Sequence, residues 1–412
     1  MKILRSQAGL SLVELLVTMI IFVLVIVAAS NIFIGILGQY KQQSKIAETS
    51  IEGLVGLQML RSDIEQAGYG LPYDIGTADY NEAVNDGTTT QDDTSFNDAG
   101  VTDAPPRAVL TGTVTGGISG LPNTYASDVL VLKATNIAMN DTVKKWASVS
   151  NTGPTNVIAT WTNTVTGGSL TEENLCYNSV APCNGADNVT VLRPAVGLRQ
   201  RVLMTDAGPP VAFYRTFPNP AAVSTVDPFF PTVESYETYI MYGLTPNGTA
   251  PRMPFNRADY YVKRPATMPT HCAPQTGVLY KATLNHGDGL HTEYPLLDCV
   301  AAMKVVLMAD TDEDAVTPLV PVTAGAWLPA PTAANIRNQL KEVRVYIIAH
   351  EGQEDPSFTY SAQGPDVALG IDHLGVWDPD VSTTVPLLNY TVPDRNYRWK
   401  VYTMVLKPYN LR

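Results

Sequence analysis

The sequence predicts an α+β protein in which one long N-terminal hydrophobic helix packs on a large, mainly antiparallel β domain. Three observations predict this class. The chain begins with an apolar run that is too long for a strand, and a second helical pattern follows it without a break. The remaining residues alternate short β-branched and aromatic runs with Pro, Gly and Asn, which is typical of many strands joined by long connections.

The apolar run extends from Leu10 to Leu37, and Glu14 is its only charged residue. As a helix it would be roughly 42 Å long, which exceeds the ~30 Å hydrocarbon core of a bilayer. We therefore expect it to span a membrane. A secretory signal cut near Val27-Ala28-Ala29 and a plain single-span anchor are alternatives, but the run is too long for the first and contains a carboxylate near its start.

The helix is expected to continue beyond the apolar run. Four apolar residues recur at spacings of three, three and four: Leu54, Leu57, Leu60 and Ile64. That spacing places them on one face of an amphipathic helix. Gly68 and Gly70 then supply a helix stop. Residues 10–70 are thus expected to form one transmembrane and assembly helix with its end. The helix itself, from about Leu10 to Ala67, would be roughly 85 Å long.

The start of the apolar run resembles the processing signal of type IV prepilins and type II secretion pseudopilins. In that pattern a short basic leader ends in Gly, an apolar residue follows, and Glu is the fifth mature residue. Here residues 1–9 form a basic leader that ends in Gly9, Leu10 follows, and Glu14 is fifth. Leu10 departs from the Phe that the family usually has at this position.

The resemblance implies that a prepilin peptidase cleaves after Gly9 and that Leu10 is N-methylated. It also implies a helix in the inner membrane, a soluble domain in the periplasm and a final position in a pilus at the cell surface. Glu14 is expected to act in assembly. A carboxylate in hydrocarbon is costly unless it is paired or protonated, and cleavage creates a new α-amine at Leu10. An axial offset between packed subunits would bring that amine to the Glu14 of a neighbour. The alternative is a carboxylate that reaches the membrane interface.

The sequence at the end of the helix resembles one particular group of these proteins. Residues 60–69, LRSDIEQAGY, are similar to a stretch of PilW-like minor pilins and of the related J-type pseudopilins. This similarity implies a non-catalytic minor pilin that primes or caps a type IV pilus, with other minor and major pilins as partners. A minor pseudopilin of a type II secretion system stays open. So does a pilus-tip adhesin, for which the candidate aromatic residues are Phe229, Phe230, Tyr260 and Tyr261.

Residues 71–412 are expected to form the β-rich soluble domain, with a solvated loop from about 74 to 106. One enlarged domain and a domain with an insertion at about 142–187 are both open. Predicted strands cover residues 127–133, 189–192, 236–242, 277–281, 300–308, 342–348 and 397–406. One further helix is expected near residues 333–340. The net charge of −12 and the pI near 4.9 argue against binding to nucleic acid, which needs a cationic surface.

Four cysteines favour two disulfides in an oxidising compartment. They form two sequence-local pairs, and neither pair has the C-x-x-C spacing of a zinc site: Cys176, Cys183, Cys272 and Cys299. Four cysteines allow three connectivities, so the pairing stays open. Four unrelated buried thiols are the alternative.

The sequence contains no G-x-S-x-G, P-loop, H-E-x-x-H or dinucleotide-binding motif, so we expect neither an enzyme nor a bound cofactor. One acidic run begins like a calcium loop, with candidate ligands Asp310, Asp312 and Asp314. Ala315 replaces the turn glycine and Pro321 replaces the bidentate Glu, so a solvated acidic turn is the competing interpretation.

Histidines suggest one further, weaker metal cluster. His286, Asp288 and His291 lie within six residues, and His271 adjoins Cys272. The glycines of the first segment make a polar loop the better interpretation.

Overall fold

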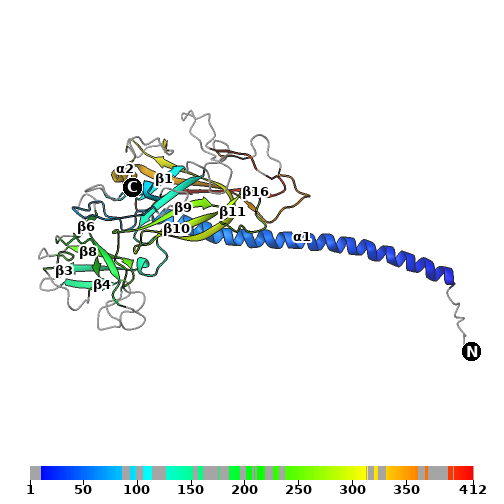
Figure 1. The fold of residues 1–412 in the computed structure, drawn as a ribbon, viewed down its shortest axis with the longest axis horizontal. Coiled ribbons are helices and arrows are strands. Elements are labelled where there is room, and N and C mark those ends of the chain that lie inside the picture. Colours follow the sequence, from blue (N-terminus) through cyan, green and yellow to red (C-terminus); the bar gives the residue numbers. More distant parts are fainter. Residues whose placement is uncertain are drawn as a thin grey trace, which may run out of the picture.

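The computed structural model describes residues 11–85, 93–98, 105–113, 127–151, 156–160, 175, 185–194, 201–206, 208, 211–218, 226–231, 237–311, 313, 320–322, 331–360, 367–369, 388–392 and 394–411. Helix α1 (Leu12–Gln66) projects far from a β domain that contains most of the remaining described residues (Figure 1). The predicted α+β class, with its long N-terminal helix and mainly antiparallel sheet, is confirmed.

Helix α1 has two halves with different surroundings. Its first half lies outside the β domain, and its last turns pack on the domain with Leu57, Leu60 and Ile64 buried. Leu54 differs from the prediction, because 61% of this residue is exposed. The helix ends at Gln66 with Ala67 as its C-cap, and Gly68 and Gly70 then adopt φ values of 80° and 64°, which glycine reaches without strain.

The main sheet is antiparallel and has the strand order β1-β2-β9-β10-β11-β13-β16, with β12 paired to β11. Its strands are β1 (Val109–Thr113), β2 (Asp128–Ala134), β9 (Asn256–Lys263), β10 (Gly277–Leu284), β11 (His291–Ala309), β12 (Val320–Val322), β13 (Leu340–Glu351) and β16 (Arg398–Leu406). Helix α2 (Ala333–Gln339) forms where the second helix is predicted and leads directly into β13.

A second sheet is formed by residues between β2 and β9, although those two strands pair directly with each other. Its strands are β3 (Trp146–Asn151), β4 (Asn156–Thr160), β5 (Asn188–Pro194), β6 (Arg201–Leu203), β7 (Arg215–Thr216) and β8 (Thr238–Thr245). Their order is β4-β3-β8-β5-β6, with β7 on β5. The segment 142–187 lies within this part of the chain. In Figure 1 the second sheet lies at the end of the molecule away from the N-terminus.

Smaller elements complete the described chain: the short helices η1 (Asp93–Phe96) and η2 (Thr142–Lys144), and a two-stranded sheet of β14 (Val367–Leu369) and β15 (Leu388–Tyr390). The solvated loop predicted for residues 74–106 is wrong in part. Ile75, Tyr80 and Glu82 are buried, because this segment runs back over the main sheet and contributes to its core.

The end of α1 lies unusually close to β11. A Cβ atom at Gly56 would meet the Leu296 carbonyl oxygen at 2.1 Å, and one at Gly53 would meet the Leu297 side chain at 2.7 Å. Only glycine therefore fits the helix surface at this contact. The close approach holds the helix directly against the first half of β11.

Candidate functional site

The exposed half of α1 is the most prominent candidate site. Residues Leu12–Ile46 have a mean hydropathy of 3.0 in their most apolar window, and none of that window is buried. Among the described residues, this is the one helix long and apolar enough to cross a membrane. Side chains such as Phe22 and Ile34 are about two-thirds exposed. An apolar surface of this extent indicates contact with lipid or with another protein.

Glu14 lies in the first turn of α1 and forms a reciprocal cap with Ser11. The Ser11 backbone N–H donates to Glu14 Oε2 at 3.0 Å, and the Glu14 backbone N–H donates to Ser11 Oγ at 3.2 Å. Both bonds satisfy donors that a helix start leaves unpaired. The cap folds the carboxylate back toward the N-terminal end of the helix, where the helix dipole also favours a negative charge.

Gly9 and Leu10, the predicted cleavage and methylation positions, lie outside the described residues, so these assignments stay predictions. The carboxylate of Glu14 nevertheless accepts the N–H of the residue that directly follows Leu10. In a chain cut after Gly9, the new α-amine would therefore form one residue from the group that Glu14 already binds.

Asp63 fastens the other end of the helix to the main sheet. Its carboxylate accepts hydrogen bonds from Tyr260 Oη on β9 and from Lys281 Nζ on β10, the latter at 2.5 Å. Burial raises the pKa of the Asp63 carboxyl, and the charge of Lys281 opposes that rise. The helix is thus fixed to two strands by a largely buried ion pair.

A buried ionic cluster was not anticipated from the sequence. Lys133 Nζ lies 2.7 Å from Glu82 Oε2 and 2.6 Å from Asp98 Oδ2, while Arg257 pairs with Asp259 at 2.7 Å. Burial alone would raise the pKa of Asp259, but Arg257 and a nearby histidine hold it below its usual value. A lysine at the end of the apolar strand 127–133 was the available signal, because such a cation needs a buried partner.

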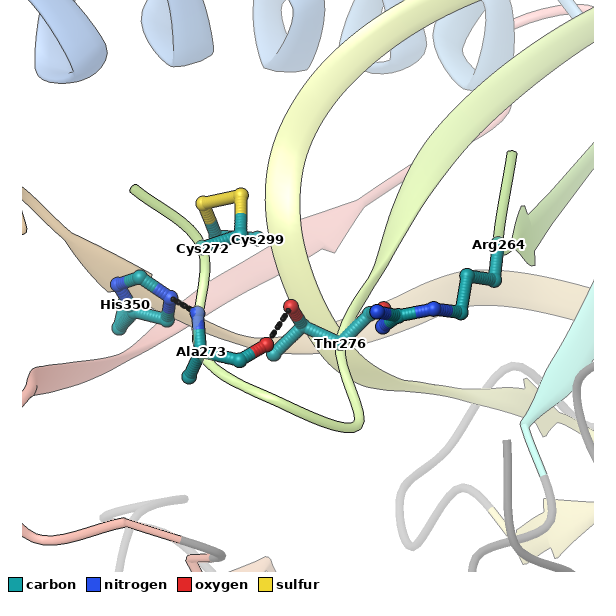
Figure 2. The surroundings of a disulfide bond; sticks show 6 residues. All are labelled: Arg264, Cys272, Ala273, Thr276, Cys299 and His350. Carbon is teal, nitrogen blue, oxygen red and sulfur yellow. Dashed lines mark hydrogen bonds between the residues drawn. A yellow bond between two sulfur atoms is a disulfide. The ribbon is translucent and has the colours of Figure 1, made fainter. Parts of the chain in front are cut away.

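The cysteines that the structure describes form one disulfide, Cys272–Cys299, with a Cα–Cα distance of 4.9 Å. It ties the loop between β9 and β10 to β11, below the ribbon of α1 (Figure 2). Cys176 and Cys183 lie outside the described residues, so their pairing stays a prediction.

Of the three candidate calcium ligands, the structure describes Asp310. Asp310 is buried, its backbone N–H donates to the Gln339 carbonyl oxygen at 2.8 Å, and its carboxylate lies 3.8 Å from Lys341 Nζ. Asp312 and Asp314 lie outside the described residues. The nearby ammonium group of Lys341 already balances part of the negative charge that a calcium ion would need.

The histidines of the β10–β11 turn have separate structural partners. His286 Nδ1 accepts the Arg252 N–H at 3.1 Å and its Nε2 faces Asn256 Oδ1 at 3.0 Å. His291 Nε2 lies 3.4 Å from Asp259 Oδ2, and the Asp288 carboxylate accepts a backbone N–H of its own turn. These three side chains do not converge on one point, which contradicts a metal site there.

The aromatic residues considered for an adhesive surface do not lie on the surface. Their side chains are buried in the cores of the two sheets: Phe229, Phe230, Tyr260 and Tyr261. They are therefore not available to bind an external ligand.

Comparison with known proteins identifies one match. Residues 4–30 match the family model described as the prokaryotic N-terminal methylation motif. No curated protein and no solved structure matches the chain. The match covers Arg5 of the leader, the capped first turn with Glu14 and the first part of the exposed apolar helix. It supports a precursor of the type IV pilin or pseudopilin kind, anchored in a membrane by this helix.

Proposed function

We propose that this protein is a minor pilin that primes or caps a type IV pilus after a prepilin peptidase has cut the chain following Gly9. One observation carries the proposal. Helix α1 presents an exposed apolar surface whose first turn holds a single carboxylate, and the methylation motif matches this same stretch. Other minor and major pilins, the peptidase and the inner membrane are the proposed partners.

In this proposal Glu14 sets the register between subunits. Before assembly its carboxylate caps its own helix through the Ser11 N–H. After cleavage, the α-amine of Leu10 supplies a cation at the same end of the helix. When helices pack side by side in lipid, where an unpaired charge is costly, the carboxylate of one subunit would pair with the amine of the next.

The size of the β domain supports a position at an end of the filament. The β domain lies at the end of a single helix that is farthest from the N-terminus (Figure 1). Repeating residues 71–412 around every turn of a thin filament would crowd the domains. A subunit that starts or terminates the filament does not face this crowding on all sides.

Mass spectrometry of the mature N-terminus tests the processing step. In the native host, the membrane-extracted protein should begin at a methylated Leu10, whereas a Gly9→Val variant should retain Met1 and the leader. A chain trimmed near Ala29, or one that keeps Met1 in the parent protein, would exclude the prepilin assignment.

A deletion strain tests the place of action. Loss of the gene should reduce the number of surface pili, and the tagged protein should label filament ends in sheared preparations. Unchanged piliation combined with a loss of protein secretion would favour the type II secretion pseudopilin instead. Label along the whole filament would contradict a priming or capping role.

A further inference from the structure

The disulfide lies in a cluster of metal-ligand atoms. The side-chain ligand atoms of His271, Cys272 and Cys299 all lie within 4.8 Å of one another. They come from two segments, the loop before β10 and the middle of β11, which the fold brings together. Among the described residues, this is the group of three that could hold a metal ion once the sulfur atoms are free.

A buried ring nitrogen without a partner points to a missing ligand. His271 Nε2 is buried and has no hydrogen-bond partner among the described residues. His350 Nε2 accepts the Ala273 N–H at 2.8 Å, which holds the His350 ring beside the loop that carries Cys272 (Figure 2). An unpaired buried nitrogen costs free energy, so a site that keeps one at His271 is suited to a Lewis acid.

A cavity of about 500 Å³ adjoins the cluster between α1 and the main sheet. Cys299, His350 and Asp298 line it together with the glycine surface of the helix. The cavity therefore brings solvent space next to the part of β11 that carries Cys299. Asp298, which also lines the cavity, interacts electrostatically with His271.

We propose that, before the Cys272–Cys299 disulfide forms, Cys272, Cys299 and His271 bind a thiophilic divalent metal ion of the zinc class. Two thiols each lose a proton and form a metal–sulfur bond, and His271 Nε2 supplies a lone pair. Water or the Asp298 carboxylate completes a tetrahedral shell, in which zinc bonds to sulfur and nitrogen at about 2.3 and 2.0 Å.

The metal ion and the disulfide are alternative cross-links between the same two segments. When a disulfide-bonded oxidant removes two electrons from the two thiolates, the Cys272–Cys299 bond forms, the disulfide of the oxidant breaks and takes up two protons from water to give a dithiol, and the metal ion leaves. Both states link the loop before β10 to β11. The metal state would let a newly exported chain fold and protect its thiols until oxidation. This inference does not depend on the proposed role in pilus assembly.

Cadmium titration of the full-length protein in detergent tests the site. The parent for the test carries Cys176→Ser and Cys183→Ser, so that the described pair supplies the only thiols. After reduction with a phosphine and its anaerobic removal, one equivalent of Cd(II) should produce the thiolate-to-cadmium absorption band. The oxidised protein should give no band, and Cys272→Ser/Cys299→Ser should remove it.

His271→Ala separates a designed site from two adjacent thiols. It should weaken cadmium binding at least about tenfold, because losing even an outer-shell partner of a metal costs 10–100-fold. If the cysteine variants do not fold, alkylation of the reduced parent gives a second measurement, since bound Cd(II) should slow labelling of both thiols. Absence of binding by the reduced parent, or equal affinity of the His271→Ala variant, would overturn the proposal.

Discussion

At the scale of single residues, two acids of α1, Glu14 and Asp63, have opposite roles. Glu14 is exposed at the helix start and, among the described residues, its hydrogen-bond partner is Ser11 in the helix cap, whereas Asp63 is held by Lys281 and Tyr260 inside the domain. A carboxylate with a local partner can exchange it for another cation. One that compensates a buried lysine cannot leave without destabilising the fold.

Charge and capping at Glu14 can be separated by substitution. Glu14→Gln keeps an acceptor for the Ser11 N–H but loses the charge, and Ser11→Ala loses the hydroxyl cap but keeps the charge. We expect Glu14→Gln to be processed normally yet to enter sheared filaments poorly. Ser11→Ala should assemble, because a lost cap costs only about 1 kcal/mol of helix stability. Equal assembly of Glu14→Gln and the parent would refute a role for the charge.

Asp63→Ala should lower the free energy of unfolding by about 3–5 kcal/mol, because it leaves Lys281 buried without its partner. The matched control is Arg61→Ala on the same helix, whose pair with Glu65 is exposed and worth at most about 0.5 kcal/mol. Denaturant unfolding of both variants, followed by tyrosine and tryptophan fluorescence, makes the comparison. Similar losses in the two variants would show that the buried pair is not special.

At the scale of elements, close contact rather than propensity decides how α1 meets the sheet. Gly53 and Gly56 weaken a helix intrinsically, yet they allow β11 to approach its backbone. In strand β9, too, tertiary contacts outweigh the local sequence preference. This strand was not predicted because Arg257 and Asp259 make it look polar, but these side chains pair with each other and lie buried.

Gly56→Ala should destabilise the protein by roughly 1–3 kcal/mol, because the new methyl group meets the Leu296 carbonyl oxygen and the helix must shift. Gly38→Ala, at a position with nothing within 4 Å, is the control and should be neutral or stabilising. Thermal unfolding followed by circular dichroism distinguishes them. A loss of stability in the Gly38 variant alone would contradict the contact argument.

At the scale of the whole molecule, a negatively charged β domain with two large sheets is attached to one apolar helix. Its stability depends on groups buried in one protonation state. Burial lowers the pKa of His286 to about 4, with a further contribution from Arg252, so the folded protein keeps this ring neutral. Unfolding returns the ring to water, where its pKa is about 6.5.

The free energy of unfolding should therefore fall as the pH falls from about 6.5 toward 4, because His286 binds a proton in the unfolded chain but not in the folded chain. Between pH 6.5 and 5, His286 alone should cost about 2 kcal/mol. His286→Gln should be less stable at pH 7 but should lose this part of the slope. Melting temperatures measured across that range test it, and an unchanged slope in the variant would exclude His286 as the cause.

The sequence by itself determined the features that depend on neighbours along the chain. The apolar run, the glycines that stop the helix and the regular spacing of its buried side chains are local, and periodicity records them directly. The same holds for seven strands that overlap the predicted ones: β2, β5, β8, β10, β11, β13 and β16.

Only the tertiary structure decided which distant residues meet. Strands β2 and β9 pair directly, although the residues of the second sheet lie between them in the sequence. Asp63 contacts a lysine 218 positions away, and Cys272 bonds to Cys299. None of these contacts produces a periodic pattern in the sequence, because each depends on the free energy of packing the whole chain. A buried charge shows in the sequence that it needs a partner, but only the fold selects that partner.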